Sequence, residues 1–276
     1  MTMNKLSIDD RAKIIGWLIE GCSMRSITRL TGAAKKTVER LLVAAGTACA
    51  DYQDKVMRDL PCLKVQCDEN WAFCYAKDAD LPEDKQGKPG FGSIWTWTAI
   101  CADTKLIPCW YIGERDAGAA YEFIQDLKNR LKHRVQLTTD GHKAYLLAVE
   151  DAFGAQVNYA ILVKMYGRPT GVEHHYSPPV YTGCTTITVQ GKPVPSEIST
   201  SYVERANLTM RMGMRRFTRL TNGFSKKYEN HCQAVALHFM HYNFCRIHQS
   251  LRCTPAMEAQ ITDHVWNSEE IAALIG

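Results

Sequence analysis

The chain has 276 residues, and its 46% hydrophobic content argues against a disordered protein and favours one large core with a small additional domain. A formal net charge of +4 permits nucleic-acid binding without requiring it, since many enzymes are equally basic. The 11 cysteines form no Cys-x-x-Cys pair, and no apolar run reaches the roughly 20 residues that span a bilayer. We therefore expect reduced thiols, no membrane segment and a soluble, intracellular protein.

Residues 7–45 predict three short helices, with Ser7 as the cap of the first and with Gly21 and Gly32 ending the first and second. A glycine-containing turn before a basic third helix is the pattern of a helix-turn-helix unit. Three-helix units also serve as plain packing modules. If the unit binds DNA, the contacts expected on its third helix are Lys35, Lys36, Thr37 and Arg40.

The sequence changes character at residue 62, where segments rich in β-branched and aromatic residues begin. The alternation of apolar and polar residues predicts strands in 62–75 and 93–112, the second segment turning at Asp103 and Thr104. Predicted helices at 116–132 and 141–153 then alternate with predicted strands at 135–139 and 157–163. Three strands in hairpin-like succession, followed by strands reached through helices, are typical of an RNase H-like mixed sheet.

The rest of the chain, from residue 164, contains a Pro-rich stretch and two further helices. Residues 164–200 read as an irregular insertion with one short strand at 185–189, and helices are predicted at 201–220 and 225–246. The expected organisation is α/β: an all-α helix-turn-helix domain at 1–46, a linker at 47–61, an RNase H-like core flanked by helices at 62–250, and a C-terminal tail at 251–276.

Three carboxylates are candidates for a metal site. Asp68 lies within an apolar strand, where a charge is costly unless a partner or a metal compensates it. Asp140 ends the fourth strand, at the edge where open α/β sheets place ligands, and Glu204 opens the following helix. The first and fourth strands are neighbours in this fold, so Asp68 and Asp140 can converge. Three such carboxylates suit two Mg²⁺ ions that bracket an in-line displacement at phosphorus.

Each carboxylate also has a structural interpretation. Asp68 could be an ordinary strand carboxylate, with the adjacent Glu69 as the more interesting group. Asp140 could belong to a turn, and Glu204 could close a capping box with Ser201.

A basic region surrounds the third carboxylate. Residues 201–228 contain seven Lys or Arg and one acid. Positions 204, 208, 211, 215 and 219 fall on one stripe of the predicted helix, so Glu204 heads a row of arginines that can follow a phosphate backbone. Asn207 could instead orient the Glu204 carboxylate. The DNA contacts expected on this helix are Arg205, Asn207, Arg211, Arg215 and Arg219.

Three segments resemble the acidic motifs of bacterial insertion-sequence transposases, most closely those of the insertion-sequence-one family. They are QCDENWAF at 66–73, TTDGHKAY at 138–145 and YVERANLTMRM at 202–212. The ending MHYNFCRIHQSL at 240–251, followed by Thr254 and Pro255, is similar to the tail of these enzymes. The resemblance covers residues 7–270 approximately.

This resemblance implies a DDE-type catalytic domain that uses Mg²⁺ or Mn²⁺ through Asp68, Asp140 and Glu204. It further implies binding to terminal inverted repeats and target DNA, action as a homo-oligomer of at least two subunits, and a bacterial cytoplasmic location that is nucleoid-associated when DNA is bound. The sequence departs from the family in two respects. The 63 residues between Asp140 and Glu204 exceed the interval in compact DDE enzymes, and the N-terminus has no paired Cys or His for a zinc finger.

We expect a transposase that hydrolyses a phosphodiester at the element end and joins the freed 3′-hydroxyl to target DNA. Two alternatives remain open at this point. One is a catalytically silent DNA-binding regulator derived from a transposase. The other is an RNase H-like nuclease that cleaves without strand transfer.

Overall fold

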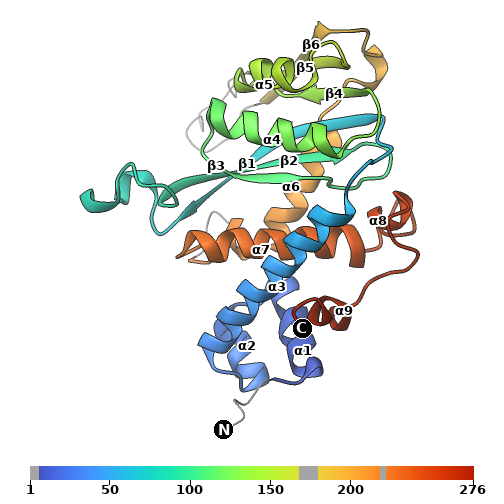
Figure 1. Cartoon of the computed structure of the whole chain (residues 1–276). Helices are drawn as coiled ribbons and strands as arrows, with labels where there is room; N and C mark the ends of the chain where they lie inside the picture. The colour runs from blue at the N-terminus through green and yellow to red at the C-terminus, as the bar shows by residue number, and fades with distance from the viewer. Residues whose placement is uncertain (1–5, 168–179, 218–221) are drawn as a thin grey trace.

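A six-stranded mixed sheet forms the centre of the computed structural model, which describes residues 6–167, 180–217 and 222–276 (Figure 1). The strands are β1 (Lys64–Cys74), β2 (Gly92–Cys101), β3 (Trp110–Gly113), β4 (Val135–Thr139), β5 (Val157–Gly167) and β6 (Val180–Gln190). Their spatial order is β3-β2-β1-β4-β5-β6. The β3-β2-β1 half is antiparallel, β1, β4 and β5 are parallel, and β6 returns antiparallel to β5. The predicted mixed α/β sheet is confirmed, and its order is compatible with an RNase H-like arrangement.

Helices cover both faces of the sheet because successive side chains of each strand point to opposite sides. On β1, Val65 and Cys67 pack into the cluster that includes α4 (Ala117–Arg130) and α5 (Ala144–Phe153). On the opposite face, Ala72 packs with residues of α6 (Ser201–Gly213) and α7 (Tyr228–Met240). Figure 1 shows these two helix pairs on either side of the sheet.

Three helices precede the sheet, as predicted: α1 (Ile8–Ile19), α2 (Met24–Thr31) and α3 (Lys35–Val56). The Ser7 side chain caps α1 by accepting a hydrogen bond from the Asp10 backbone amide. Gly32 ends α2 in the left-handed conformation, with φ of 71°. α3 continues as one helix through most of the segment interpreted as a linker. An independent N-terminal domain stays a prediction.

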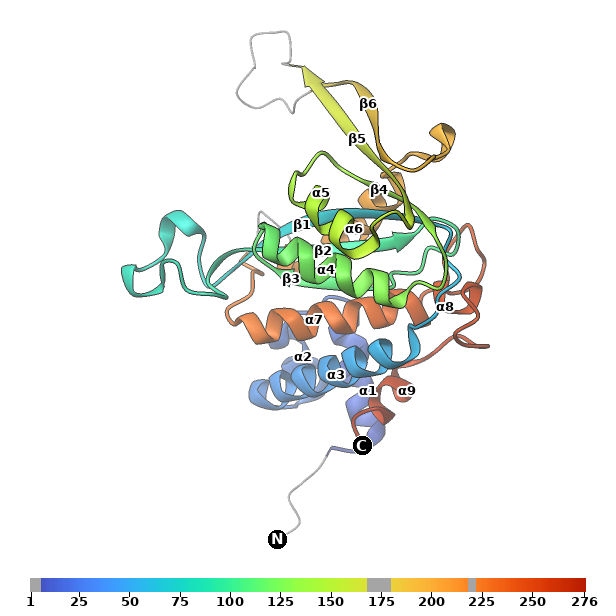
Figure 2. The ribbon, with the colours of Figure 1, turned by 45° about the horizontal axis from the view of Figure 1, so that its top comes forward.

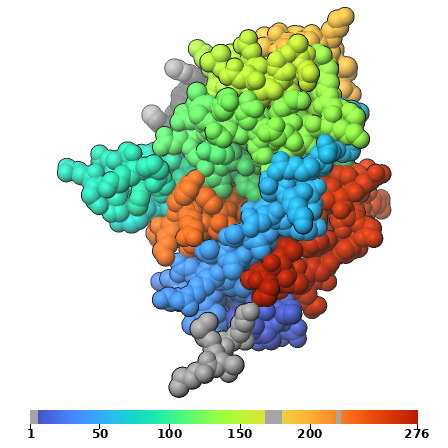
Figure 3. Space-filling model, in the orientation of Figure 1, coloured from blue at the N-terminus to red at the C-terminus, as the bar shows by residue number. Residues whose placement is uncertain are grey.

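α3 lies at close range along α7. A Cβ atom on Gly46 would stand 2.4 Å from the Gln233 carbonyl oxygen, and the Gln53 side chain donates a hydrogen bond to the Ala236 carbonyl. The short C-terminal helices are α8 (Pro255–Glu258) and α9 (Ser268–Ala273), and α9 packs against α1. Figure 3 shows the blue N-terminal helices and the red C-terminal segment in contact on one face. The N-terminal helices are therefore packed against the rest of the chain.

The segment interpreted as an irregular insertion is more regular than expected. β5 continues to Gly167, and β6 spans residues 180–190 instead of 185–189. Figure 2 shows this strand pair extending away from the other strands. The prediction was wrong for these residues because the prolines that suggested irregular structure all lie outside both strands. Residues 168–179, which belong to the same predicted insertion, lie outside the described residues.

The predicted helix at 201–220 is shorter in the structure. α6 ends at Gly213, a residue that is unfavourable in helices, and Met214 has an extended backbone. Short 3₁₀ turns occur at Asp78–Asp80, Glu83–Lys85, Pro195–Glu197 and Arg215–Phe217, and a π-helical turn at His241–Cys245 follows α7. Within the described ranges, no helix is both long and apolar enough to cross a bilayer.

The α3–α7 contact predicts opposite effects for one substitution at two helical glycines. Gly46→Ala places a methyl group against the Gln233 backbone, so we expect overpacking to lower stability by about 1–3 kcal/mol. Gly16→Ala, in α1, meets no atom within 4 Å, and higher helix propensity should raise stability by up to about 1 kcal/mol. Urea unfolding followed by circular dichroism measures both. Destabilisation of equal size at both positions would contradict the close approach.

Candidate metal centre

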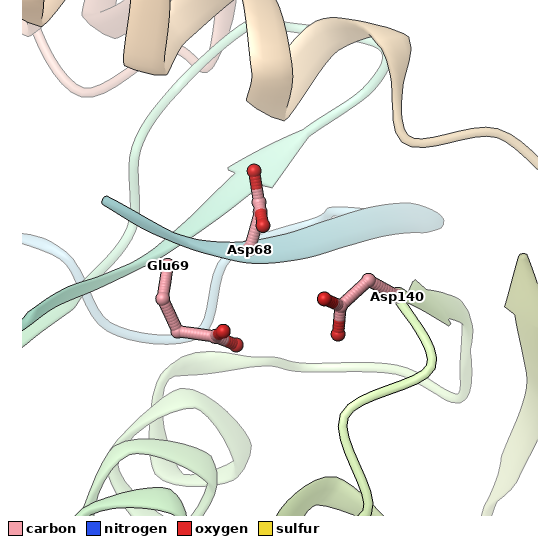
Figure 4. A group of neighbouring side chains, drawn as sticks. All are labelled: Asp68, Glu69 and Asp140. Atoms are coloured by element: carbon pink, nitrogen blue, oxygen red, sulfur yellow. The ribbon is translucent and has the colours of Figure 1, made fainter. Parts of the chain in front are cut away.

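The sheet topology brings two of the predicted carboxylates together. β1 and β4 are parallel neighbours with Gln66 paired to Thr138, so Asp68, two residues further along β1, lies beside Asp140 at the end of β4. Figure 4 shows Asp68 and Glu69 leaving β1 on opposite sides, with the Asp140 side chain pointing toward them. Oxygen atoms of these three carboxylates lie within 4.8 Å of one another. Glu69, which was interpreted only as an alternative to Asp68, therefore joins the group.

Asp68 is held by α6 through a regular series of polar contacts. The Gln66 amide oxygen accepts hydrogen bonds from the backbone amides of Tyr202 and Val203. The Asn207 amide donates to the Asp68 carboxylate at 2.8 Å, and Arg211 Nε donates to the Asn70 amide oxygen at 2.9 Å. Alternate residues of β1 thus each contact a successive turn of α6.

Glu204 lies in the same pocket but outside the group of three. The pocket has a volume of about 710 Å³, and Asp68, Asp140 and Glu204 all line it. The Glu204 carboxylate accepts a hydrogen bond from the Thr200 hydroxyl at 2.5 Å and forms an ion pair with Lys164 of β5. The capping box with Ser201, which was the alternative interpretation of Glu204, is not formed, because α6 begins one residue earlier than that interpretation required and Thr200 occupies the N-cap.

Arg115 is the functional candidate that the sequence did not reveal. Its Nε donates to the Glu69 carboxylate at 3.0 Å, and its Nη2 lies 3.6 Å from an Asp140 oxygen. Its guanidinium lies over the Trp95 ring, 4.9 Å from the ring centre. No motif points to this residue, because its neighbours are brought together only by the folding of three separate segments. The Arg115 guanidinium thus pairs with two carboxylates and also makes a cation–π contact with an aromatic ring.

Burial and mutual repulsion favour the protonated carboxyl groups. Burial, followed by the charge of Asp140, raises the pKa of Asp68 to about 6 against the opposing effect of the Asn207 hydrogen bond. The same two causes raise the pKa of Glu69 to about 7, although Arg115 acts in the opposite direction. The Glu69 side chain is only 1% exposed. A bound cation would relieve this repulsion.

The donor set fits a hard divalent cation. All the available ligand atoms are carboxylate oxygens, which Mg²⁺ and Mn²⁺ prefer, and the pocket is open enough for water and phosphate oxygens to complete a coordination shell. The Asn207 amide oxygen, next to Asp68, is buried and accepts no hydrogen bond from the described residues. The site is therefore a candidate metal centre built on Asp68 and Asp140.

The residues predicted to contact DNA differ in their exposure to solvent and in their contacts. Lys35, Lys36, Arg40, Arg205 and Arg215 are exposed, and Thr37 is partly exposed. Asn207 is 1% exposed and bonds to Asp68, so the structure gives it a buried positioning contact in place of the predicted surface contact. Arg211 is directed to Asn70. The expected helical row of arginines was wrong, because α6 ends at Gly213 and Arg215 follows in a 3₁₀ turn; Arg219 lies outside the described residues.

A second, basic cavity lies between the N-terminal helices and the α6–α7 region. Its volume is about 910 Å³. It is lined by one acidic residue, Glu39, and by six basic residues, namely Arg25, Lys35, Arg215, Arg216, Lys226 and Lys227. Lys227 pairs with Glu39, and Arg216 donates a hydrogen bond to the Ser225 hydroxyl. Most of this positive charge is therefore available to an anionic partner. We call this cavity the basic groove.

Comparison with known proteins gives little further guidance. No family model and no curated protein matches the sequence. Solved structures that match include a chain of the crystal structure of the Mos1 strand transfer complex, at 12% identity over 87% of this chain and 77% of that chain. The TM-score of this match is 0.25, which is too low to support an argument about fold or function.

The raised pKa of Asp68 predicts a pH-dependent effect of removing its charge. Without metal, the folded protein holds this proton more tightly than the unfolded chain does, so stability is lost as pH rises from about 4 through 6. Asp68→Asn removes this loss and retains an acceptor for Asn207. In EDTA at pH 8, we expect the variant to exceed the wild type by up to about 3 kcal/mol in unfolding free energy, and by about half as much at pH 5.

Urea unfolding at the two pH values measures this difference. Asp151→Asn, which makes the same change at an exposed position of α5, serves as the control. An advantage of Asp68→Asn that is equal at pH 5 and pH 8 would show that its cause is not the buried charge.

Proposed function

We propose that the chain is a DNA transposase of the DDE type that cleaves phosphodiesters at element ends and joins the freed 3′-hydroxyl to target DNA. The observation that carries this proposal is the meeting of Asp68 and Asp140 at adjacent parallel strands, with Glu204 across the same pocket. The three motifs that resemble insertion-sequence-one transposases supply these same residues in the same order. The proposal includes a homo-oligomer of at least two subunits acting on paired ends.

The proposed catalytic and metal-binding residues are Asp68, Asp140 and Glu204, with Glu69 beside them. Two Mg²⁺ ions, or Mn²⁺ in their place, would neutralise the phosphate charge and assist both the attacking and the leaving oxygen when bound. Asn207 fixes the Asp68 carboxylate, and Arg115 orients Asp140 and holds Glu69. Each of these contacts restricts a carboxylate before substrate binds, which reduces the reorganisation that the reaction requires.

DNA recognition is proposed to involve two surfaces. The first is the exposed face at the start of α3, with Lys35, Lys36 and Arg40 on a helix-turn-helix unit made of α1–α3. The second is the basic groove, because six basic residues around a single acid leave an excess of positive charge that attracts a phosphodiester backbone. Lys35 belongs to both surfaces, so one DNA duplex could contact them together.

Activity should depend on the three carboxylates. With a duplex that carries the ends of the element, a supercoiled target and Mg²⁺ or Mn²⁺, we expect cleavage and strand transfer by the wild type. Asp140→Asn and Glu204→Gln should each reduce both steps by at least about 10- to 100-fold, the loss that follows removal of even an outer partner of a metal site. Asp151→Asn, the same change on the surface of α5, should retain activity.

The outcomes separate the competing functions. Full activity of Asp140→Asn would exclude the assigned site. Cleavage without joining under all conditions would favour a nuclease. Specific duplex binding with no cleavage in any divalent ion would favour a DNA-binding regulator.

The basic groove predicts a salt-dependent contribution to DNA affinity. Arg25→Ala and Lys226→Ala remove exposed charges from its two walls. Each variant should weaken duplex binding. The plot of the log association constant against log salt should also become less steep, by about 0.9 for each phosphate that the protein no longer neutralises. Fluorescence anisotropy over salt concentrations from about 50 to 200 mM measures this slope. Lys55→Ala, on the exposed side of α3, is the control, and equal slopes for all four proteins would argue against the groove.

A further inference from the structure

Lys164 stands beside the candidate metal centre because of the two-residue period of β5. Ala160 and Leu162 precede it on the same face of the strand and pack with Ile198 in a small cluster of their own. Lys164 continues this face beyond the cluster, where it lines the pocket and reaches Glu204. The sheet, and not a flexible loop, therefore positions the base of this side chain.

The contacts of Glu204 explain why it is outside the group of three carboxylates. One of its oxygens accepts the Thr200 hydroxyl and the other accepts the Lys164 ammonium group. Both oxygens are thus occupied by the protein. Asp68, across the pocket, has no Lys, Arg or His within ion-pair distance among the described residues, and the charge of Glu204 adds to the repulsion that raises its pKa.

The ion pair between Lys164 and Glu204 is suited to exchange. The Lys164 side chain is 30% exposed and that of Glu204 38%, and ion pairs in contact with water contribute little to stability. Arg115 differs, because it serves two carboxylates and lies over Trp95. Of the two cations paired with carboxylates of this pocket among the described residues, Lys164 is the one that can leave at low cost.

We propose that Lys164 is an exchangeable counter-ion of Glu204. In the metal-free protein it neutralises this carboxylate and holds it away from Asp68 and Asp140. When Glu204 takes up a divalent cation together with those two residues, the Lys164 ammonium group is released into the pocket and binds a phosphate oxygen of the DNA. This inference rests on the proposed function for its second half, whereas the exchange itself concerns only metal binding.

Metal binding tests the exchange directly. Mn²⁺ titrations followed by electron paramagnetic resonance compare the full-length wild type with Lys164→Met, which keeps an unbranched side chain one atom shorter and removes its charge. Because the competing cation is absent, we expect roughly tenfold tighter Mn²⁺ binding, within the usual range of coupling between linked sites. Lys164→Arg should bind Mn²⁺ like the wild type. The double variant Lys164→Met with Glu204→Gln should lose the gain.

Lys143 provides a matched control. It lines the same pocket and forms no ion pair among the described residues, so Lys143→Met removes one positive charge without freeing a carboxylate. Its effect on Mn²⁺ affinity should be much smaller than that of Lys164→Met. Equal effects at the two positions, or unchanged affinity in Lys164→Met with a wild-type unfolding midpoint, would overturn the exchange.

Cleavage tests the phosphate contact. At saturating Mn²⁺, single-turnover cleavage of the end duplex should be slower in Lys164→Met despite its tighter metal binding, and Lys164→Arg should restore most of the rate. Faster cleavage by Lys164→Met would mean that the lysine only obstructs the site, which would overturn the second half of the proposal. If no protein, including the wild type, cleaves, the proposed function fails while the Mn²⁺ titrations still decide the exchange.

Discussion

The match in spacing between β1 and α6 determines where the groups of the candidate site can lie. Two residues of a strand advance about 6.6 Å and four residues of a helix about 6 Å, so the two elements stay in step when they run side by side. Gln66, Asp68 and Asn70 consequently meet α6 near Val203, Asn207 and Arg211. A carboxylate could not remain partly buried at Asp68 without such a partner, because an unpaired polar group in this position is costly.

The electrostatics of the pocket follow from this arrangement. Asp68 is fixed by a neutral amide, which orients its charge without cancelling it, whereas Glu69 and Asp140 share Arg115 and Glu204 has Lys164. Among the described residues, Asp68 is therefore the carboxylate of this group that no Lys or Arg pairs with. Burial, followed by the charge of Asp140, raises the pKa of Asp68 above that of an ordinary surface aspartate.

The sequence predicts the parts of this site that depend on local pattern. Asp68 and Asp140 could be placed together because apolar alternation defines their strands and neighbouring parallel strands end at one edge. Lys164 and Arg115 could not be predicted as parts of the site. Their partners Glu204 and Glu69 lie 40 and 46 residues away along the chain, and no spacing rule relates them. The end of α6 at Gly213 was missed because the helical spacing of apolar residues continues beyond it. The backbone does not continue as a helix, since Met214 is extended.

The same distinction applies to the larger elements. Thr185, Thr186 and Ile187 have strong strand preferences, yet the nearby prolines concealed the full length of β6, which pairing with β5 stabilises along its whole extent. Residues 47–56 belong to the segment interpreted as a linker, and their continuity with the third helix depends on packing against α7. Gly46 contributes to that packing through a feature that sequence alone does not reveal, the absence of a side chain where two backbones approach.

The unbroken α3 would fix the distance between two contact points along a bound DNA duplex. At about 1.5 Å per residue its 22 residues span about 33 Å, close to one turn of a DNA duplex, and their attachment to α7 leaves no hinge between the two ends. Under the proposed function, the distance from the base pairs read by the start of α3 to the scissile phosphate is then set by a rigid rod. Added or deleted base pairs between them would have to be absorbed by bending or twisting the DNA. Element ends should accordingly show a fixed spacing even where their sequences vary.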